Sequence, residues 1–450
     1  MDGIGKANQA GNAASEKEKM GFNATWSMAV GGMVGGGIFS VLGVVLGTAG
    51  GWAWLSFLLA GLIALATGHS YIALAARYGE GGGAFTFLRK IHRDGFAGGL
   101  SWILLMGYVL TISVYAFTFG HYLGTLLQGG GWLDRVASVG IVLVLTGVNL
   151  AGVGEASKVE IVTVWGKLAV LFGLAAAGLW HFYPEAVRYP SAQPGGIGGA
   201  VVGAAVIFMA YEGFQLLTYD YEDIRDPERT LPMAVKSAIV SVIVVYILVT
   251  LGSVNLVGAG NLVQHKEVAL AEAGQAVLGM AGRVIVSIAA AFSTASAINA
   301  TLFATARLAS TVAADGELPA FFSRKNSHGV PDRSVILLGL LGASLALVGN
   351  LEDLVESASL AFLFTFATVN VLSALKTRKG NWISWAGAAG AAAAGGMLLL
   401  RVLEHQPAAL AGILFMVIMA VVVRPLMLKR PVRDQSAESD GRPGPPDHQG

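Results

Sequence analysis

The sequence has no cysteine and few charged residues. Only 13% of its 450 residues are Asp, Glu, Lys or Arg, against roughly a quarter in soluble domains. The absence of cysteine excludes disulfides and thiolate metal sites, and the isolated His69 and His121 have no second ligand at metal-site spacing. The net charge of +1 gives no indication of a nucleic-acid partner. We therefore expect no metal, no other cofactor and no nucleic acid.

Apolar sequence dominates instead, at 54% of residues and a mean hydropathy of +0.65. A helix needs about 20 apolar residues to cross roughly 30 Å of hydrocarbon. On this basis the sequence predicts an all-α polytopic membrane protein. Its twelve predicted spans are residues 24–46, 51–76, 96–127, 136–151, 157–182, 199–219, 233–257, 282–311, 334–348, 354–375, 382–400 and 407–427.

The distribution of Lys and Arg predicts the orientation. If the N-terminus is cytoplasmic, most of the 29 basic residues fall on the cytoplasmic side, as the positive-inside rule requires. The outer connections then hold only Arg135, Arg188, Lys266, Arg283 and Arg401. We expect both termini to be cytoplasmic, with no cleavable signal peptide in the polar residues 1–20. The tail 431–450 is polar and rich in Pro and Gly, so we expect it to be disordered.

Glycines crowd the centre of the first span, from Gly31 to Gly37. They weaken a helix where hydrocarbon offers no replacement hydrogen bonds. One interpretation is close packing of neighbouring helices on small residues. The other is an interrupted helix whose freed peptide groups bind a polar ligand at the bilayer midplane. The sequence of this span alone does not separate the two.

The sixth span contains a second candidate break, where Glu212 precedes Gly213. It lies five spans after the first, and an odd offset means that a repeated five-helix unit is inverted relative to its first copy. Paired breaks in inverted halves indicate the binding site of a secondary transporter. The half-helix ends that such breaks expose suit a small zwitterion. Glu212 could bind its ammonium group, titrate during transport, or only hydrogen-bond the peptide groups of its own break.

Two further features of the spans indicate a coupling site. Lys167 lies about 15 Å into the fifth span, too deep to reach the interface easily. An intramembrane lysine indicates proton transfer or replacement of a bound cation; the other interpretation is a structural ion pair, although Glu160 is two turns away. In the eighth span, Ser293 and Thr294 either line a cation site or bond back to carbonyls of their own helix.

From Gly21 through the last span, the chain resembles the amino acid–polyamine–organocation (APC) permeases. Gly35-Gly36-Gly37-Ile38-Phe39 is similar to the family's Gly-Ser-Gly-Ile-Phe motif in helix one. The segment from Ala210 to Pro232, with Glu222-Asp223-Ile224 and Asp226-Pro227-Glu228-Arg229-Thr230, is similar to the exit of helix six and is the most specific match. Arg307 with Asp315-Gly316 and Leu318-Pro319 is the third motif.

The resemblance implies a 5+5 inverted-repeat (LeuT-like) core with discontinuous helices 1 and 6. Its parts would be a cytoplasmic tail (1–20), a first repeat (21–195), a second repeat (196–376), two appended helices (377–430) and a C-terminal tail (431–450). The substrate carboxylate would meet the amides of Gly35, Gly36 and Gly37, and its amino group the carbonyls of Phe208, Ala210 and Tyr211. Lys167 resembles the helix-five lysine that takes the place of sodium in proton-coupled members.

Two departures from the family pattern concern the substrate. Gly36 replaces the usual serine, and Glu212 replaces an apolar or small residue, so the extra carboxylate could favour a basic amino acid or a polyamine. We expect a plasma-membrane secondary transporter of amino acids, coupled to protons through Lys167, with an exchanger or polyamine permease as the alternative. A channel is less consistent with paired breaks, and no catalytic motif indicates an enzyme.

Overall fold

The protein is helical wherever its regular structure is described. The computed structural model describes residues 19–81, 83–91, 94–152, 157–180, 196–377 and 381–428. Nine helical segments in these ranges are long and apolar enough to cross a membrane. The predicted all-α class is confirmed, and the number of twelve spans stays a prediction. Residues 1–18, Arg188, the side chain of Glu160 and the tail 431–450 lie outside the described part.

Each predicted span corresponds to helical structure, and the boundaries differ by a few residues. The main helices are α2 (Phe22–Ala49), α3 (Ala53–Tyr78), α5 (Asp94–Leu127), α6 (Gly131–Leu150), α7 (Ser157–Trp180), α9 (Gly196–Val206), α10 (Pro227–Val257), α13 (Met280–Ala314), α14 (Asp332–Val348), α15 (Leu351–Lys376), α16 (Asn381–His405) and α17 (Pro407–Ile418). The short helices are α4 (Gly83–Arg89), α11 (Ala259–Gln264), α12 (Ala269–Leu278) and α18 (Arg424–Met427). A π-helical turn, Met419–Val423, joins α17 to α18.

Local sequence explains where several helices begin and end. Gly79 closes α3 in the left-handed conformation, with φ 66°, which a side chain would disfavour. Pro227 opens α10, where its missing N–H costs no intrahelical bond. At the start of α15 the Asn350 side chain accepts a hydrogen bond from the Asp353 N–H, and this cap satisfies an otherwise unpaired donor.

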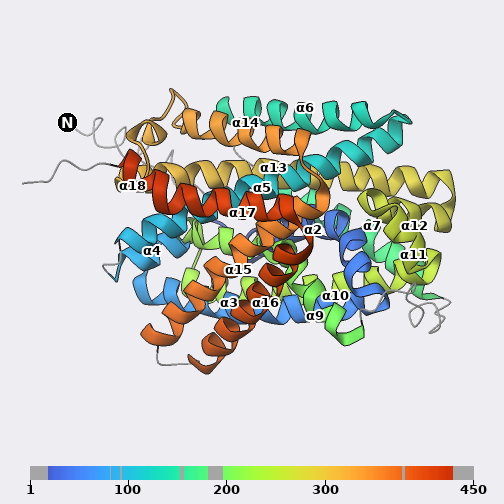
Figure 1. Ribbon diagram of the computed structural model, residues 1–450, viewed down its shortest axis with the longest axis horizontal. Coiled ribbons are helices and arrows are strands. Elements are labelled where there is room, and N and C mark those ends of the chain that lie inside the picture. Colours follow the sequence, from blue (N-terminus) through green and yellow to red (C-terminus); the bar gives the residue numbers. More distant parts are fainter. Residues whose placement is uncertain are drawn as a thin grey trace, which may run out of the picture.

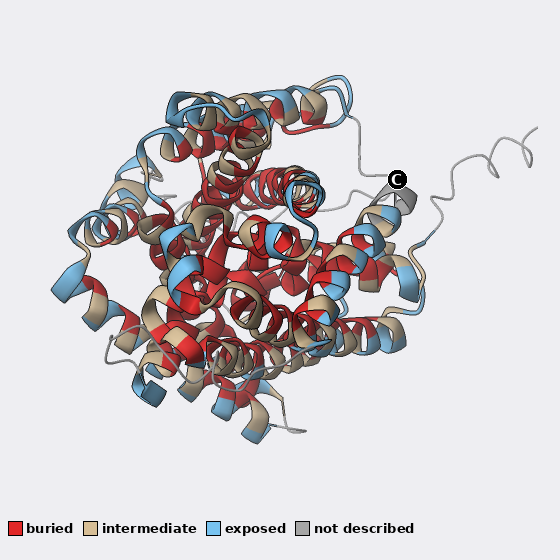
Figure 2. Ribbon diagram, turned by 90° about the vertical axis from the view of Figure 1, so that its right-hand side faces the viewer, coloured by how far each residue is buried: buried red, intermediate tan, exposed pale blue. Residues whose placement is uncertain are grey.

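The helices form a bundle with α2 near its centre (Figure 1). The long helices run across the view, with α4 and α18 at one end and α11 and α12 at the other. Seen along the bundle, buried residues gather in the middle and exposed ones at the edge (Figure 2). In the most apolar stretch of Phe22–Tyr78, 94% of the residues are buried, against 11% in Pro407–Met427. The last helical segment is therefore the least buried of the candidate spans in the described ranges.

The predicted break in helix one is wrong for this structure. α2 is helical without interruption through Gly35, Gly36 and Gly37, so their amides lie inside a continuous helix. A glycine costs a helix only about 1 kcal/mol relative to alanine, and packing against neighbouring helices compensates for that cost. Of the two interpretations of this glycine stretch, close helix packing is the one observed.

The predicted break in helix six is confirmed. α9 ends at Val206, and the chain continues as two short 3₁₀ turns, Phe208–Tyr211 and Phe214–Thr218. Between the two turns, Glu212 has ψ −91° and Gly213 has φ +23°, so no α-helical ladder passes through this point. We call residues 207–218 the helix-six break. All of its residues are buried.

Candidate functional site

The helix-six break lies directly against the glycine stretch of α2. A Cβ atom on Gly32 would lie 2.9 Å from Gly213 Cα, and one on Gly213 would lie 2.5 Å from the carbonyl carbon of Gly32. These distances are too short for a side chain on either residue, and backbone atoms cannot move aside cheaply. The two glycines therefore allow the break and α2 to touch backbone to backbone.

A side chain of α15 replaces part of the helical ladder that the break loses. The Met209 N–H donates to Ser359 Oγ at 3.0 Å, and the Ser359 hydroxyl donates to the Val206 carbonyl at 2.6 Å. Ser359 is fully buried. Because buried peptide groups without partners are costly, this serine stabilises the non-helical conformation of the break. No sequence motif identified it beforehand.

Tyr246 of α10 ties the break to α2. Its hydroxyl lies 2.7 Å from the Met33 carbonyl and 3.1 Å from the Ala210 carbonyl, so one proton is shared between the two segments. Gly37 lies at the same point, since a Cβ there would be 3.0 Å from Ala210 O and would collide with the Tyr246 hydroxyl. The structure thus brings together Gly37 and Ala210, which lie far apart in the chain and which the resemblance to the APC permeases placed in one site.

Glu212 is the centre of a buried polar cluster. Its side chain is 1% exposed, and the Gln215 amide lies 3.4 Å from its Oε2 while donating to the Tyr108 hydroxyl at 2.7 Å. The hydroxyls of Tyr108 and Tyr219 are 3.3 Å apart. Of this cluster, the sequence identified only Glu212. Tyr108 belongs to α5, and nothing in its local sequence indicates that it lies in a polar cluster.

The two aromatic residues of the predicted site have separate partners. The Phe208 ring packs edge-on against Phe366 of α15, with ring centroids 5.6 Å apart. The Tyr211 hydroxyl donates to the Phe57 carbonyl of α3 at 2.7 Å. Both side chains anchor the break to its surroundings. The backbone carbonyl of the intervening Ala210 faces α2 and the Tyr246 hydroxyl.

Neighbouring helices cover the other two glycines of the predicted site. A Cβ on Gly35 would lie 2.7 Å from Ala297 Cβ of α13, and one on Gly36 would overlap the ring of Tyr115 from α5. The glycine that replaces the usual serine therefore makes room for a tyrosine. The hydroxyl of Tyr115 is buried and has no hydrogen-bond partner among the described residues.

Replacing Gly36 by the family's usual serine is expected to destabilise the protein, because the serine side chain would collide with the Tyr115 ring. Overpacking of this kind typically costs about 1–3 kcal/mol, which lowers the thermal midpoint of Gly36→Ser. The added cost of serine is expected to shrink in a Tyr115→Ala background, because the colliding ring is gone. Gly140→Ser is the control, since nothing lies within 4 Å of a Cβ there. Equal losses for Gly36→Ser in both backgrounds would contradict the packing described here.

Lys167 and Ser293 meet α2 one turn apart. Lys167 is 3% exposed, and its Nζ donates to the Gly31 carbonyl at 3.2 Å. The Ser293 hydroxyl donates to the Val34 carbonyl at 3.3 Å. Thr294 instead donates to Ala290 of its own helix at 2.8 Å. Of the three predicted coupling residues, two therefore contact α2 beside the glycine stretch, and Thr294 follows the simpler interpretation.

The second and third sequence motifs meet at one end of the bundle. Arg307 Nη1 lies 2.8 Å from Asp220 Oδ1, just beyond the helix-six break. Asp315 forms an ion pair with Arg89. In addition, Met20 pairs with the chain around Ile224 through a short parallel bridge. These contacts explain why charged residues accompany the apolar helices at these positions.

The protein is a bundle of apolar helices that encloses a broken helix, a buried carboxylate and a buried lysine. These features define a multi-pass membrane protein with a polar centre. Comparison with known proteins agrees. Residues 20–432 match the amino acid permease family, and the chain belongs to this family, within the APC superfamily.

Three relatives illustrate the range of the family. The chain is 33% identical to an uncharacterized protein of Methanocaldococcus jannaschii, over 76% of this chain and 79% of the relative. It is 30% identical to the inner membrane transport protein YbaT of Escherichia coli, over 77% and 81%. It is 26% identical to the serine/threonine exchanger SteT of Bacillus subtilis, over 70% and 72%. Family and relatives together support a transporter of small molecules.

Proposed function

We propose that this protein is a secondary active transporter that carries amino acids across the plasma membrane by alternating access. The observation that carries the proposal is the helix-six break, packed against the glycine stretch of α2 through Gly213 and Gly32. Non-helical backbone at membrane depth is tolerated where it is buried in protein or lines a cavity, and in many secondary transporters discontinuous helices form the substrate site. Membership of the amino acid permease family supports the substrate class.

We propose that the substrate binds between the glycine stretch and the break. Its amino group would meet the carbonyls of Phe208, Ala210 and Tyr211, and its carboxylate would lie toward Gly35, Gly36 and Gly37. In this structure the Tyr115 ring covers Gly36 and the Tyr246 hydroxyl occupies the space beside Gly37. Binding at the glycines therefore requires these two side chains to move, as expected of a site that opens and closes during transport.

We propose that Lys167 couples transport to protons. Its ammonium group reaches the Gly31 carbonyl, one turn of α2 before the glycines at positions 35–37. When the lysine loses its proton, its hydrogen bond to the Gly31 carbonyl weakens. This bond matters for transport because α2 forms one wall of the proposed site. Gain and loss of this proton would thereby favour different positions of α2 relative to α7.

The proposed architecture is two inverted repeats, residues 21–195 and 196–376, each with five spans. Both termini would be cytoplasmic. The end of the bundle with α4 and α18 would then face the cytoplasm, and the end with α11 and α12 would face outward (Figure 1). Lys266 forms an ion pair with Glu352 at 2.9 Å at the outer end, so the segment before α12 is tied to α15 there.

Uptake into proteoliposomes tests the proposal. We expect radiolabelled amino acids to accumulate when the outside is more acidic than the lumen, and not when an inward sodium gradient is the only driving force. Saturation with rising substrate concentration is expected of a carrier. Accumulation driven by sodium alone would contradict proton coupling, and unsaturable flux without counterflow would identify a channel.

An exchanger is the second candidate, and the similarity to the serine/threonine exchanger of Bacillus subtilis favours it. Loading the liposomes with unlabelled substrate separates the two, because an obligate exchanger needs internal substrate and a proton symporter does not. Competition in the same assay tests the substrate's side chain. Glu212 favours a second amine, so stronger competition by lysine or putrescine than by leucine would indicate a cationic substrate.

A further inference from the structure

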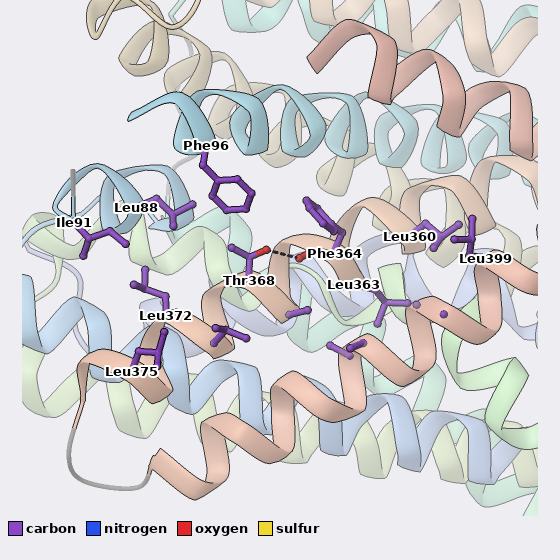
Figure 3. A pocket seen from close by; sticks show the side chains of 16 residues that line it. Leu88, Ile91, Phe96, Leu360, Leu363, Phe364, Thr368, Leu372, Leu375 and Leu399 are labelled. Atoms are coloured by element: carbon purple, nitrogen blue, oxygen red, sulfur yellow. Dashed lines mark hydrogen bonds between the residues drawn. The ribbon is translucent and has the colours of Figure 1, made fainter. Parts of the chain in front are cut away.

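An apolar groove lies on the outside of the bundle between α4, the start of α5, α15 and α16. Its volume is about 740 Å³, within the range of roughly 300–1,000 Å³ that ligand pockets occupy. Figure 3 shows Leu88, Ile91, Leu372 and Leu375 at one end and Leu360 and Leu399 at the other. The groove therefore runs lengthwise along α15.

Small residues of α16 leave this groove unfilled. Ala391, Ala392, Gly395 and Gly396 line its floor. A Cβ on Gly396 would have no atom within 4 Å, and one on Gly395 would make an ordinary contact with Leu363 at 3.6 Å. Larger side chains would fit on this face of α16 without strain. The groove thus exists because α16 has small side chains at these positions, and not because of the way the helices cross.

The chemistry of the groove excludes a polar ligand. Among its lining side chains only Thr368 carries a polar atom, and the Thr368 hydroxyl donates to the Phe364 carbonyl of its own helix at 2.9 Å (Figure 3). A hydrophilic solute would lose its hydration there and gain no hydrogen bond. Because α15 and α16 are both long and apolar enough to span a membrane, hydrocarbon chains are the surrounding solvent.

One end of the groove is basic. Leu375 is followed by Lys376 in the last turn of α15, and Arg89 and Lys90 lie between the lining residues Leu88 and Ile91. Arg89 pairs with Asp315, and Lys90 pairs with Glu80. Lys376 is exposed and makes no ion pair within the described ranges. A cation at the end of an apolar groove between membrane helices can bind an anionic lipid headgroup.

We propose that this groove binds one acyl chain of an anionic phospholipid, with the headgroup phosphate held by Lys376. In the proposed orientation the lipid belongs to the cytoplasmic leaflet. The binding site is separate from the proposed substrate site, and its occupant is a component of the bilayer and not a transported solute.

The groove and the helix-six break are both in contact with α15. Leu360 and Leu363 face the groove, and their neighbours Ser359 and Phe362 lie on the buried side of α15. Ser359 holds the peptide groups of Met209 and Val206. α15 therefore contacts the groove through one set of residues and the break through another.

Native mass spectrometry of the full-length protein tests this inference, with phosphatidylglycerol and phosphatidylcholine of identical acyl chains as probes. Each buried CH₂ group contributes about fourfold in affinity, so filling the groove with Gly396→Leu is expected to weaken binding of both lipids by at least about tenfold. Gly173→Leu is the matched control, because it is an exposed helical glycine of α7 with nothing within 4 Å. We expect it to bind both lipids as the unmodified protein does.

The headgroup contact is tested separately. Lys376→Gln is expected to weaken phosphatidylglycerol binding about fivefold, since one basic residue near an anionic headgroup contributes about that much, and to leave phosphatidylcholine unaffected. Lys236→Gln, an exposed lysine of α10, is the control for charge. If Gly396→Leu is not monodisperse, Ala392→Leu, on the same face of α16, replaces it.

Three outcomes would overturn the proposal. The groove would not be the lipid site if Gly396→Leu retained phosphatidylglycerol as the unmodified protein does. The headgroup assignment would fail if Lys376→Gln lost both lipids equally or neither. If the unmodified protein were a dimer and Gly396→Leu a monomer with unchanged lipid binding, the occupant would be a second copy of this chain. None of these readouts requires transport, so they are independent of the proposed function.

Discussion

Replacing Lys167 by alanine is expected to remove the response of uptake to a pH gradient. In the unmodified protein we expect uptake to rise as the outside becomes more acidic than the lumen, and in Lys167→Ala we expect it to be nearly flat. Coupling between two binding sites typically changes affinity by roughly 5- to 150-fold, and we expect a loss of accumulation in that range. The physical reason is that the Nζ–Gly31 contact is the link between this titratable group and α2.

The lysine variant should still fold. Burying an ammonium group costs desolvation free energy, and its removal recovers that cost. Lys167→Met serves as a second variant because its side chain fills most of the space that the lysine leaves. Lys236→Ala is the control, because Lys236 is exposed on α10. A Lys167→Ala protein that elutes as a single species and keeps its full pH response would refute the role of Lys167.

Replacing Gly213 by alanine is expected to give the largest loss of stability. A methyl group there would lie 2.5 Å from backbone atoms of Gly32 and Met33, and φ is +23°. Overpacking typically costs about 1–3 kcal/mol, and a positive φ adds about 1–2 kcal/mol for a residue with a Cβ, so we expect a loss of about 2–5 kcal/mol. The thermal midpoint of the purified protein in detergent measures it.

Gly173→Ala is the matched control for this loss. The same change in α7, with open space around the Cβ, should raise stability by up to about 1 kcal/mol, because alanine favours helix. Gly32→Ala should also lower stability, since a methyl group there would lie 2.9 Å from Gly213 Cα. Its loss should be smaller than that of Gly213→Ala, because Gly32 has helical geometry within α2. If Gly213→Ala unfolded at the same temperature as Gly173→Ala, the close approach of the break to α2 would be disproved.

The two candidate breaks show how far local sequence predicts such a feature. At position 213 the prediction was confirmed, and the reason lies partly in the chain itself, because glycine weakens a helix. At positions 35–37 the prediction was wrong. Tyr115 of α5 and Ala297 of α13 pack on those glycines. The sequence around the glycines does not predict these contacts.

For Lys167, too, the sequence predicted one property, and another depended on the tertiary structure. Its position in an apolar span predicted that Lys167 lies deep in the membrane, because depth follows from position in the span. Its contact with the Gly31 carbonyl was not predictable, since it depends on how α7 crosses α2. The cluster of Tyr108, Gln215 and Glu212 also depends on helix placement, and only the carboxylate was identifiable beforehand.

By itself, the sequence determined that this is a helical membrane protein of a permease family, with a carboxylate and a lysine inside it and a weak point in the sixth span. The membrane class and the depth of the two charged groups follow from composition and from the length of apolar segments, and the weak point follows from Gly213. The family follows from the resemblance of three sequence motifs to those of the APC permeases. Only the tertiary structure decided that the glycines of α2 serve as a packing surface, with Tyr115, Tyr246 and the helix-six break lying on them. A glycine changes helix stability by about 1 kcal/mol, and the packing of distant side chains outweighs so small a local term.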